Sequence, residues 1–428
     1  MTADTTPADL KATPRAGSVI GLLAGAHFSH HVLTALIVPL LPFIRNEFGL
    51  TYAQAGLVTS AFTITYGVGQ LPAGWLADRV GPRYLLLLGI TGVAVAGLIV
   101  GLSPLFAVLI GGLLIMGIAG GGYHPASSAV IANLVHPSRT GRAMGVHIIG
   151  GSTSFFLAPL MAAGLVTALG WRGTFLALSV PVALLGLALF VLISRRMGAM
   201  GLGRIPARAS AAESAPQAGA GEPEPTQASG GSAGVRPSRS RAAVAHMTFF
   251  LILTGIMGAG FGSLIPYLPL YLADVRGVDE AVAAGFLSVI FAAGFFAAPL
   301  GGLLSDRLGR VRVLVAAGLL LAPAIVAITV LPFPLPFAAG LLVLGVLMFV
   351  RMPTSEAHIS ATVEKRNRGT VLGIYFFSGA EGSAVLTPLL GATIDRWGFS
   401  AGILGMGALV LVAALVCGTA MYAIRRRV

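Results

Sequence analysis

The chain has 428 residues, of which 56% are hydrophobic and 10% are charged, and its formal net charge is +12. So apolar a composition excludes a soluble fold whose surface faces water, and we expect the chain to lie in a lipid bilayer. The positive charge does not indicate nucleic acid as a partner, because no basic stripe with interleaved aromatic residues is present.

Apolar stretches of about 20 residues recur along the chain and predict twelve membrane-spanning helices. In chain order they cover residues 18–44, 52–77, 83–102, 105–134, 142–168, 172–194, 246–273, 278–304, 311–331, 335–362, 369–394 and 398–424. Residues 197–243 are rich in Ala, Gly, Pro and Ser, which predicts a flexible linker. The expected parts are a terminal segment (1–17), an N-terminal six-helix bundle (18–194), the linker (195–245), a C-terminal six-helix bundle (246–424) and a tail (425–428).

Arginine and lysine are distributed unevenly between alternate loops. Of the 27 in the chain, four lie in the odd-numbered loops, one lies inside a predicted span, and the rest lie in the termini, the linker and the even-numbered loops. Because positively charged loops stay on the cytoplasmic side of a membrane, this pattern places both termini and the linker in the cytoplasm. We expect a multi-pass protein of the cytoplasmic (inner) membrane.

One eight-residue peptide occurs twice, and the two copies are 228 residues apart. The first copy, from Gly74 to Gly81, reads GWLADRVG, and the second, from Gly302 to Gly309, reads GLLSDRLG. Pro125 and Pro353 keep the same interval, so one helical plan is repeated along the chain. Two similar bundles packed face to face create a central cavity that can open to either side of a membrane, which favours a transporter.

The two peptides, the duplicated halves and the long central loop resemble the major facilitator superfamily. The first half is further similar to the fosmidomycin-resistance branch of drug exporters, through His27, the run Tyr123-His124-Pro125, and Gly150-Gly151 followed by Ala158-Pro159. The resemblance implies an all-α integral membrane fold, in which twelve helices form two pseudo-symmetric six-helix bundles. It also implies transport by alternating access.

The resemblance further implies that the two peptides act in gating. The candidate gating residues are Gly74, Asp78, Arg79, Gly81, Arg83, Gly302, Asp306, Arg307, Gly309 and Arg310. A carboxylate at these positions can pair with an arginine, or accept hydrogen bonds from a helix N-terminus of the other half, when the cytoplasmic side is closed. The alternative interpretation is that these charges only set the membrane topology.

The first half carries polar side chains in its spans, although those predicted spans contain no Asp or Glu. They are His27, His30 and His31 in the first span, Tyr123 and His124 in the fourth, and His147 in the fifth. The first three are three or four residues apart, so they can share one side of a helix. We interpret the set as cavity-lining groups that bind substrate or handle protons, with packing histidines as the alternative. No acid joins them and Cys417 is the only cysteine, so we predict no metal site.

The second half supplies the charged groups within the membrane. Arg351 stands at the repeat position of Tyr123, and the nearby candidates for substrate or proton binding are Ser355, Glu356, His358 and Glu381. An arginine at mid-membrane costs at least about 2.5 to 3.5 kcal/mol, so it needs a polar cavity or a partner. Arg351 is our candidate for binding an anionic group of the substrate, and an ion pair with Glu381 or Glu356 is the alternative. Of the two acids, Glu381 is the better candidate, either for the proton site or for the counter-ion of Arg351, and the sequence does not separate these roles.

These observations predict a proton-coupled secondary active transporter that exports a drug or metabolite as a monomer in the lipid bilayer. Nothing resembles a phosphate-binding loop, and no nucleophile with its base can be assembled, so we predict no ATP, no cofactor and no enzyme activity. Proton-coupled uptake of a small organic anion is a second interpretation. The third is a sensor or partner-binding membrane protein without transport, because acids of the resembled branch are replaced here by His31 and Ala126.

Overall fold

The structure is a computed structural model, and it describes residues 14–135, 137–199 and 241–425. The regular elements in these ranges are all helices, which confirms the prediction of an all-α fold. The predicted terminal segment up to residue 13, most of the predicted linker and the last three residues lie outside the described residues.

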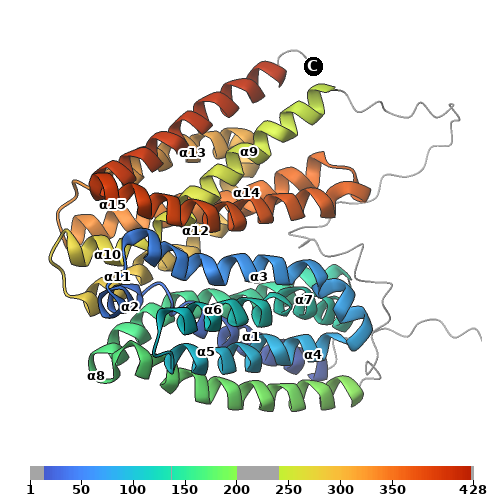
Figure 1. Ribbon diagram of the computed structural model, residues 1–428. Helices are drawn as coiled ribbons and strands as arrows, with labels where there is room; N and C mark the ends of the chain where they lie inside the picture. Colours follow the sequence, from blue (N-terminus) through green and yellow to red (C-terminus); the bar gives the residue numbers. More distant parts are fainter. Residues whose placement is uncertain (1–13, 136, 200–240, 426–428) are drawn as a thin grey trace, which may run out of the picture.

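Two helical bundles follow one another along the chain (Figure 1). The first consists of α1 (Pro14–Thr34), α2 (Leu41–Phe48), α3 (Tyr52–Val80), α4 (Pro82–Leu87), a π-helical turn (Leu88–Gly92), α5 (Val93–Gly101), α6 (Phe106–Gly121), α7 (Tyr123–Leu134) and α8 (Pro137–Ala199). The second consists of α9 (Arg241–Leu264), α10 (Tyr267–Asp274), α11 (Glu280–Ala292), α12 (Gly294–Leu308), α13 (Arg310–Ala327), α14 (Leu335–Thr362) and α15 (Lys365–Arg425).

The breaks between helices follow the internal repeat. The first predicted span of each half is divided, into α1 and α2 and into α9 and α10, and Pro42 and Pro266 stand where the second piece begins. Proline fits a first helical turn, where its missing N–H is not needed, but it interrupts a continuing helix. The long helices α8 and α15 are bent at Gly170 (φ 65°) and Gly398 (φ 79°), which are again 228 residues apart.

Eight helical stretches in the described part of the chain are long and apolar enough to cross a membrane. Two of them, Arg142–Gly198 with 57 residues and Asn367–Arg425 with 59, are far longer than the roughly 20 residues that one crossing needs. Each contains one of the glycine bends and therefore supplies two crossings. The polar helix α1 and the helix α3 are outside this set, so the count of twelve spans stays a prediction.

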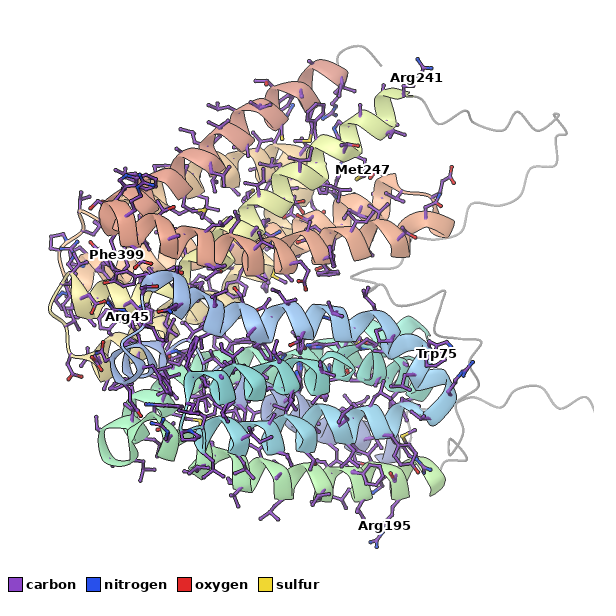
Figure 2. The ribbon with its side chains drawn as sticks, in the orientation of Figure 1. Arg45, Trp75, Arg195, Arg241, Met247 and Phe399 are labelled. Atoms are coloured by element: carbon purple, nitrogen blue, oxygen red, sulfur yellow. The ribbon has the colours of Figure 1, made fainter. Side chains whose placement is uncertain are left out.

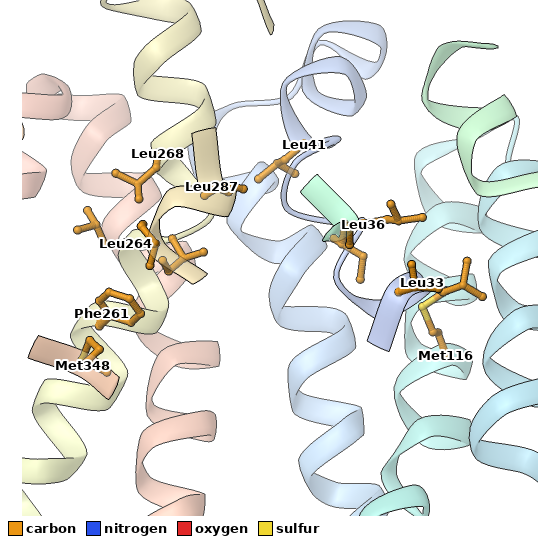
Figure 3. Close-up of a cluster of buried hydrophobic side chains, with 14 of the residues drawn as sticks. Leu33, Leu36, Leu41, Met116, Phe261, Leu264, Leu268, Leu287 and Met348 are labelled. Atoms are coloured by element: carbon orange, nitrogen blue, oxygen red, sulfur yellow. The ribbon is translucent and has the colours of Figure 1, made fainter. Parts of the chain in front are cut away.

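The two bundles meet along a seam formed by α3 and the first arm of α15, with α8 against α11 beside it (Figure 1). An apolar core runs through both bundles, and Figure 3 shows part of it, with Leu33, Leu36 and Met116 from the first half and Phe261 and Leu264 from the second. Large apolar side chains also point outward, as a lipid-facing surface requires.

Hydrogen bonds between the two halves gather at one end of the molecule, which we call the joined end and define by Arg45, Tyr52, Asp274 and Asp395. The opposite end carries the two repeated peptides, and we call it the motif end. Figure 2 shows Arg45 and Phe399 toward the joined end, and Trp75, Arg195 and Arg241 toward the motif end.

Within the first half, a polar cluster at the joined end ties α2 to the bend of α8. The indole Nε1 of Trp171 donates to Glu47 at 2.6 Å, and Arg172 both bonds Glu47 and donates to the Ser103 carbonyl at 2.7 and 3.0 Å. The hydrogen bond from Arg172 is the largest influence on the Glu47 carboxyl and holds its pKa below the ordinary value. The ionised carboxylate therefore stabilises the folded protein.

Acidification is expected to remove this stabilisation. Because the pKa of Glu47 is lower in the folded than in the unfolded chain, the contribution is present above the unfolded pKa and is lost as pH falls through the folded pKa. The Glu47 side chain is 45% exposed, so the effect on the free energy of unfolding stays below about 1 kcal/mol. Thermal midpoints of the detergent-purified protein and of Glu47→Gln, each at neutral pH and near pH 3.5, will measure it. We expect the thermal midpoint of the wild type to fall further on acidification than that of Glu47→Gln. Equal falls would contradict this role of Glu47.

Candidate functional site

Five histidine side chains of the first half converge, although they come from three helices. Helix α1 contributes three of them, α7 one and α8 one, namely His27, His30, His31, His124 and His147. The rings of His27 and His147 stack with centroids 4.2 Å apart, and those of His31 and His124 lie 5.2 Å apart. The structure thus brings together every histidine that the sequence singled out in this half.

Backbone carbonyls orient these rings. His27 Nδ1 lies 2.8 Å from the carbonyl of His147, His147 Nδ1 lies 3.1 Å from the carbonyl of Leu23, and His30 Nδ1 lies 2.6 Å from the carbonyl of Gly89. A carbonyl only accepts, so each of these Nδ1 atoms carries a hydrogen, and in the neutral ring Nε2 is then a lone-pair acceptor. The Nε2 atoms of His27 and His147 are buried without a hydrogen-bond partner.

Tyr123 holds the cluster from one side. Its ring is fully buried and stacks against His30 with centroids 4.5 Å apart and against His27 at 5.6 Å. Its hydroxyl donates to the Leu23 carbonyl at 3.2 Å. Tyr123 therefore contacts the histidines as part of their packing.

Glycines allow α8 to approach α1 closely enough for this arrangement. A Cβ at Gly151 would lie 2.5 Å from the ring of His27, and a Cβ at Gly150 would overlap the carbonyl of Ala24. Small residues at a helix contact permit such an approach in membrane proteins. Gly150 and Gly151, which carry part of the family resemblance, thus let α8 come close enough to α1 for the histidine rings to pack together.

Arg351 of α14 is buried in the second half, with 8% of its surface exposed. Its Nη1 donates to the Thr254 carbonyl at 3.2 Å and to the Tyr375 hydroxyl at 3.1 Å, while its Nε is buried without a partner. Tyr375 stands at the repeat position of His147, as Arg351 does for Tyr123. At these two repeat positions, the first half therefore has the stacked rings of Tyr123 and His147, whereas the second half has the cation Arg351 beside Tyr375.

The two acids that the sequence offered as partners, Glu356 and Glu381, do not form ion pairs with this cation. The ion pairs found among the described residues join Arg45 to Asp274 and Arg172 to Glu47. Glu381 lies instead at the seam, where a Cβ on Gly67 of α3 would overlap its carboxylate, and its Oε1 is buried without a hydrogen-bond partner. Glu356 is partly buried in α14. The alternative of a fixed ion pair with Arg351 is thus absent from this structure.

Ser355 and His358 follow Arg351 along α14, and both are buried. His358 packs on Phe250 with ring centroids 4.5 Å apart and lines a cavity of about 650 Å³ at the motif end. Asp306, Arg307, Gly309, Arg310 and His246 line the same cavity. His358 therefore lies with the candidate gating residues of the second half rather than with the guanidinium of Arg351.

The gating peptides owe their last glycine to backbone geometry. Gly81 and Gly309 both have φ of 92°, in the region that favours glycine, and each lies between the helix carrying the peptide and the next helix. Arg79 lies over the Trp75 ring at 4.1 Å, and Arg83 lies over Tyr84 at 4.8 Å. A Cβ at Gly302 would meet nothing within 4 Å. Gly74 and Asp78 belong to α3, and the structure does not describe the surroundings of Gly74 or the side chain of Asp78.

Sequence analysis missed the polar network at the joined end. The carboxylate of Asp395 accepts hydrogen bonds from the backbone amides of Tyr52 and Ala53 at 2.8 and 2.9 Å, at the N-terminus of α3. Asp274 accepts from Arg45 at 3.1 Å and from the Tyr52 hydroxyl at 2.7 Å. A carboxylate at a helix N-terminus is favoured by the exposed amides and the helix dipole. Only the charges around Asp274 were visible in the sequence, and nothing there indicated their partners.

Comparisons with known proteins agree with one another. The profile of the Major Facilitator Superfamily matches residues 23–380 and 250–427. The chain is similar to a probable sulfoacetate transporter of Cupriavidus necator, at 25% identity over 413 residues (91% of this chain, 92% of the relative). It is 30% identical over 416 residues to the transcription regulatory protein OpdE of Pseudomonas aeruginosa (94% of each). It is 24% identical over 305 residues to the fosmidomycin resistance protein of Escherichia coli (71% and 69%).

Among solved structures, the fold is similar to a bacterial homologue of the human lysosomal transporter Spinster in an inward-facing and unoccupied conformation. The TM-score is 0.71 at 17% sequence identity, and the match covers 97% of this chain and 98% of that chain. At so low an identity the likeness concerns the fold alone.

Proposed function

The chain belongs to the Major Facilitator Superfamily of membrane transporters, and on this premise we propose that it is a secondary active transporter that exports a small drug or metabolite in exchange for protons. The family is one of transporters rather than enzymes, and the relative from Cupriavidus necator is likewise named a transporter. The protein is a multi-pass membrane protein, and we further propose that it works as a monomer in the inner membrane with both termini in the cytoplasm.

The observation that carries the proposal is the position of Glu381. This carboxylate has a buried oxygen without a hydrogen-bond partner, and it contacts α3 of the other half across the seam. A charge left unpaired in a membrane is costly, so protonation changes how well the two halves fit together there. A single proton site between two moving bodies is what coupling to a proton gradient requires.

The joined end supports alternating access. Asp274 and Asp395 of the second half bind Arg45 and the N-terminus of α3 in the first, so these contacts must break before that end opens. The unequal distribution of arginine and lysine places the motif end in the cytoplasm. The structure then corresponds to a state closed on the outside, and the opposite state requires new contacts at the repeated peptides.

Transport by the purified protein in lipid vesicles tests this function. A growth and susceptibility screen, with and without the protein, first selects a compound. We then expect an imposed pH gradient to drive uphill movement of that compound, and reversal of the gradient to reverse the movement. Net movement of the compound that ignores the sign of the gradient would rule out proton coupling.

One observation favours uptake of an organic anion as a second candidate. Arg351 is a buried cation that forms no ion pair with an acid among the described residues, and the similar relative from Cupriavidus necator is named a probable sulfoacetate transporter. Cells carrying the protein would then accumulate a small sulfonate or carboxylate, whereas export predicts lower accumulation of the screened compound. The direction of net flux distinguishes the two.

A sensor is a candidate of another class, because the relative from Pseudomonas aeruginosa is named a transcription regulatory protein. A sensor would bind a partner protein and would move no compound under any gradient. Absence of transport across a broad panel, together with a specific membrane or cytoplasmic partner recovered by cross-linking, would favour it.

A further inference from the structure

We propose that His27, His31 and His124 form a binding site for one transition-metal dication of the Zn²⁺ type. Each offers a ring nitrogen, and these three nitrogens all lie within 4.8 Å of one another. The sequence predicted no metal site, because no acid joins the histidines and Cys417 is the only cysteine. Only the fold brings α7 against α1 and places His124 beside His31, 93 residues away. This inference goes beyond transport and does not depend on it.

The spacing of the ring nitrogens is close to that of a tetrahedral site. Zn–N bonds of about 2.0 to 2.1 Å put two ligand nitrogens roughly 3.3 Å apart. The Nε2 atoms of His31 and His124 are already 3.2 Å apart, so only the ring of His27 must move closer. In the ion-free protein these two atoms share one hydrogen, and a metal ion would take the place of that hydrogen.

The outer nitrogens of the two α1 ligands are held as ligand histidines require. His27 Nδ1 donates to the His147 carbonyl at 2.8 Å, which leaves Nε2 as a lone pair, and this Nε2 is buried without a partner. His31 Nδ1 lies 3.3 Å from the Thr34 hydroxyl. Metal-ligating histidines commonly donate their second nitrogen to a carbonyl or similar group, which sets the tautomer and the direction of the ring. A buried lone pair without a donor is otherwise a cost to the fold.

The ligand set selects the class of metal. Three neutral imidazoles suit Zn²⁺, Cu²⁺ and Ni²⁺, whereas Mg²⁺ and Ca²⁺ need oxygen ligands that the cluster lacks. The acids of the first half after residue 14 are Glu47, which lies in α2 and accepts from Trp171 at the joined end, and Asp78, which stands in the last turn of α3. Three protein ligands leave a fourth position for water or an anionic donor, and the partly exposed His124 is the side from which an ion enters.

Metal binding to the purified full chain, prepared without a histidine tag and stripped with a chelator, tests the site. We expect one Zn²⁺ per chain in competition with a chromophoric chelator. With Co²⁺ as the probe, we expect the strong visible absorption of a tetrahedral site. His124→Ala is expected to weaken Zn²⁺ binding at least about 100-fold, since loss of an outer-shell partner alone costs 10 to 100-fold.

Two further variants separate loss of the site from loss of the fold. Gly151→Ala keeps all three ligands but places a Cβ against the His27 ring, so it is expected to weaken binding without deleting a ligand. His246→Ala, in the second half, removes a histidine outside the cluster and is expected to bind like the wild type. The proposal is overturned if the wild type binds no Zn²⁺, or if His124→Ala, with a thermal midpoint like that of the wild type, binds it equally well. Transport activity enters none of these measurements.

Discussion

The Arg351→Ala variant is expected to transport the screened compound at least about 100-fold more slowly than the wild type. In the wild type, the guanidinium donates to the Thr254 carbonyl and the Tyr375 hydroxyl. It forms no ion pair within the part of the chain that the structure describes, so it can bind an anionic group of the substrate. Hydrogen bonds to charged groups contribute about 1.5 to 3 kcal/mol each, and about 1.4 kcal/mol corresponds to a factor of ten. Initial rates in lipid vesicles, measured over a range of substrate concentrations, will show the loss.

Two matched variants define the role of this cation. Arg351→Lys keeps the charge but loses the planar pair of donors, so an intermediate loss of roughly tenfold is expected. Tyr375→Phe removes one hydrogen bond and keeps the guanidinium, so its loss is expected to be smaller still. Removing a buried charge relieves an insertion cost, so Arg351→Ala should not lower the thermal midpoint. A lower midpoint with unchanged transport would show that Arg351 serves stability instead.

The Glu381→Gln variant is expected to lose proton-driven accumulation while retaining exchange. Glutamine fills the same space against Gly67 but cannot take up or release a proton. A gradient of one pH unit supports about tenfold accumulation for each proton coupled, because one unit corresponds to 1.36 kcal/mol. In vesicles the accumulation ratio should fall from about ten to about one, while exchange of labelled for unlabelled compound without a gradient continues.

Glu356→Gln is the control for this experiment. Glu356 is the other acid away from the ends of the second-half spans, but it lies in α14, whose main packing partners among the described helices all belong to the second half. The Glu356→Gln variant is expected to keep most of the proton-driven accumulation of the compound. Tenfold accumulation by Glu381→Gln, or its loss in both variants alike, would remove Glu381 as the specific coupling site.

The joined end and the seam give these predictions a common structural basis. Small residues sit where the halves are closest, since a Cβ at Gly56 would meet the Tyr267 hydroxyl at 2.4 Å and the Pro388 backbone at 2.9 Å. The Tyr267 hydroxyl also lies 3.1 Å from the carbonyl of Tyr52 in the first half, to which it donates. These contacts bring the two bundles close together on one side of Glu381. Protonation of Glu381 therefore affects the fit of the interface as a whole.

Much of the architecture can be predicted from local sequence patterns. Hydrophobic stretches and the 228-residue repeat were sufficient to predict an all-α membrane fold of two related halves, because each span must satisfy its own backbone hydrogen bonds in lipid. The repeated peptides end in Gly81 and Gly309 because a positive φ is needed there, and that requirement is local too. The division of the first span of each half, at Pro42 and Pro266, was shown by the structure.

The site depended on contacts that no local pattern contains. Sequence spacing grouped three histidines of α1, but His147 joins them only because glycines let α8 lie against α1, and His124 only because α7 packs beside α1. Likewise, Glu381 was an equal candidate for pairing with Arg351, and the packing of α15 against α3 placed it on the other half's surface instead. Composition and periodicity determined that the chain is a duplicated helical membrane protein. Which polar groups meet was decided by the tertiary structure, because such pairs are made by helix packing between residues far apart in the chain.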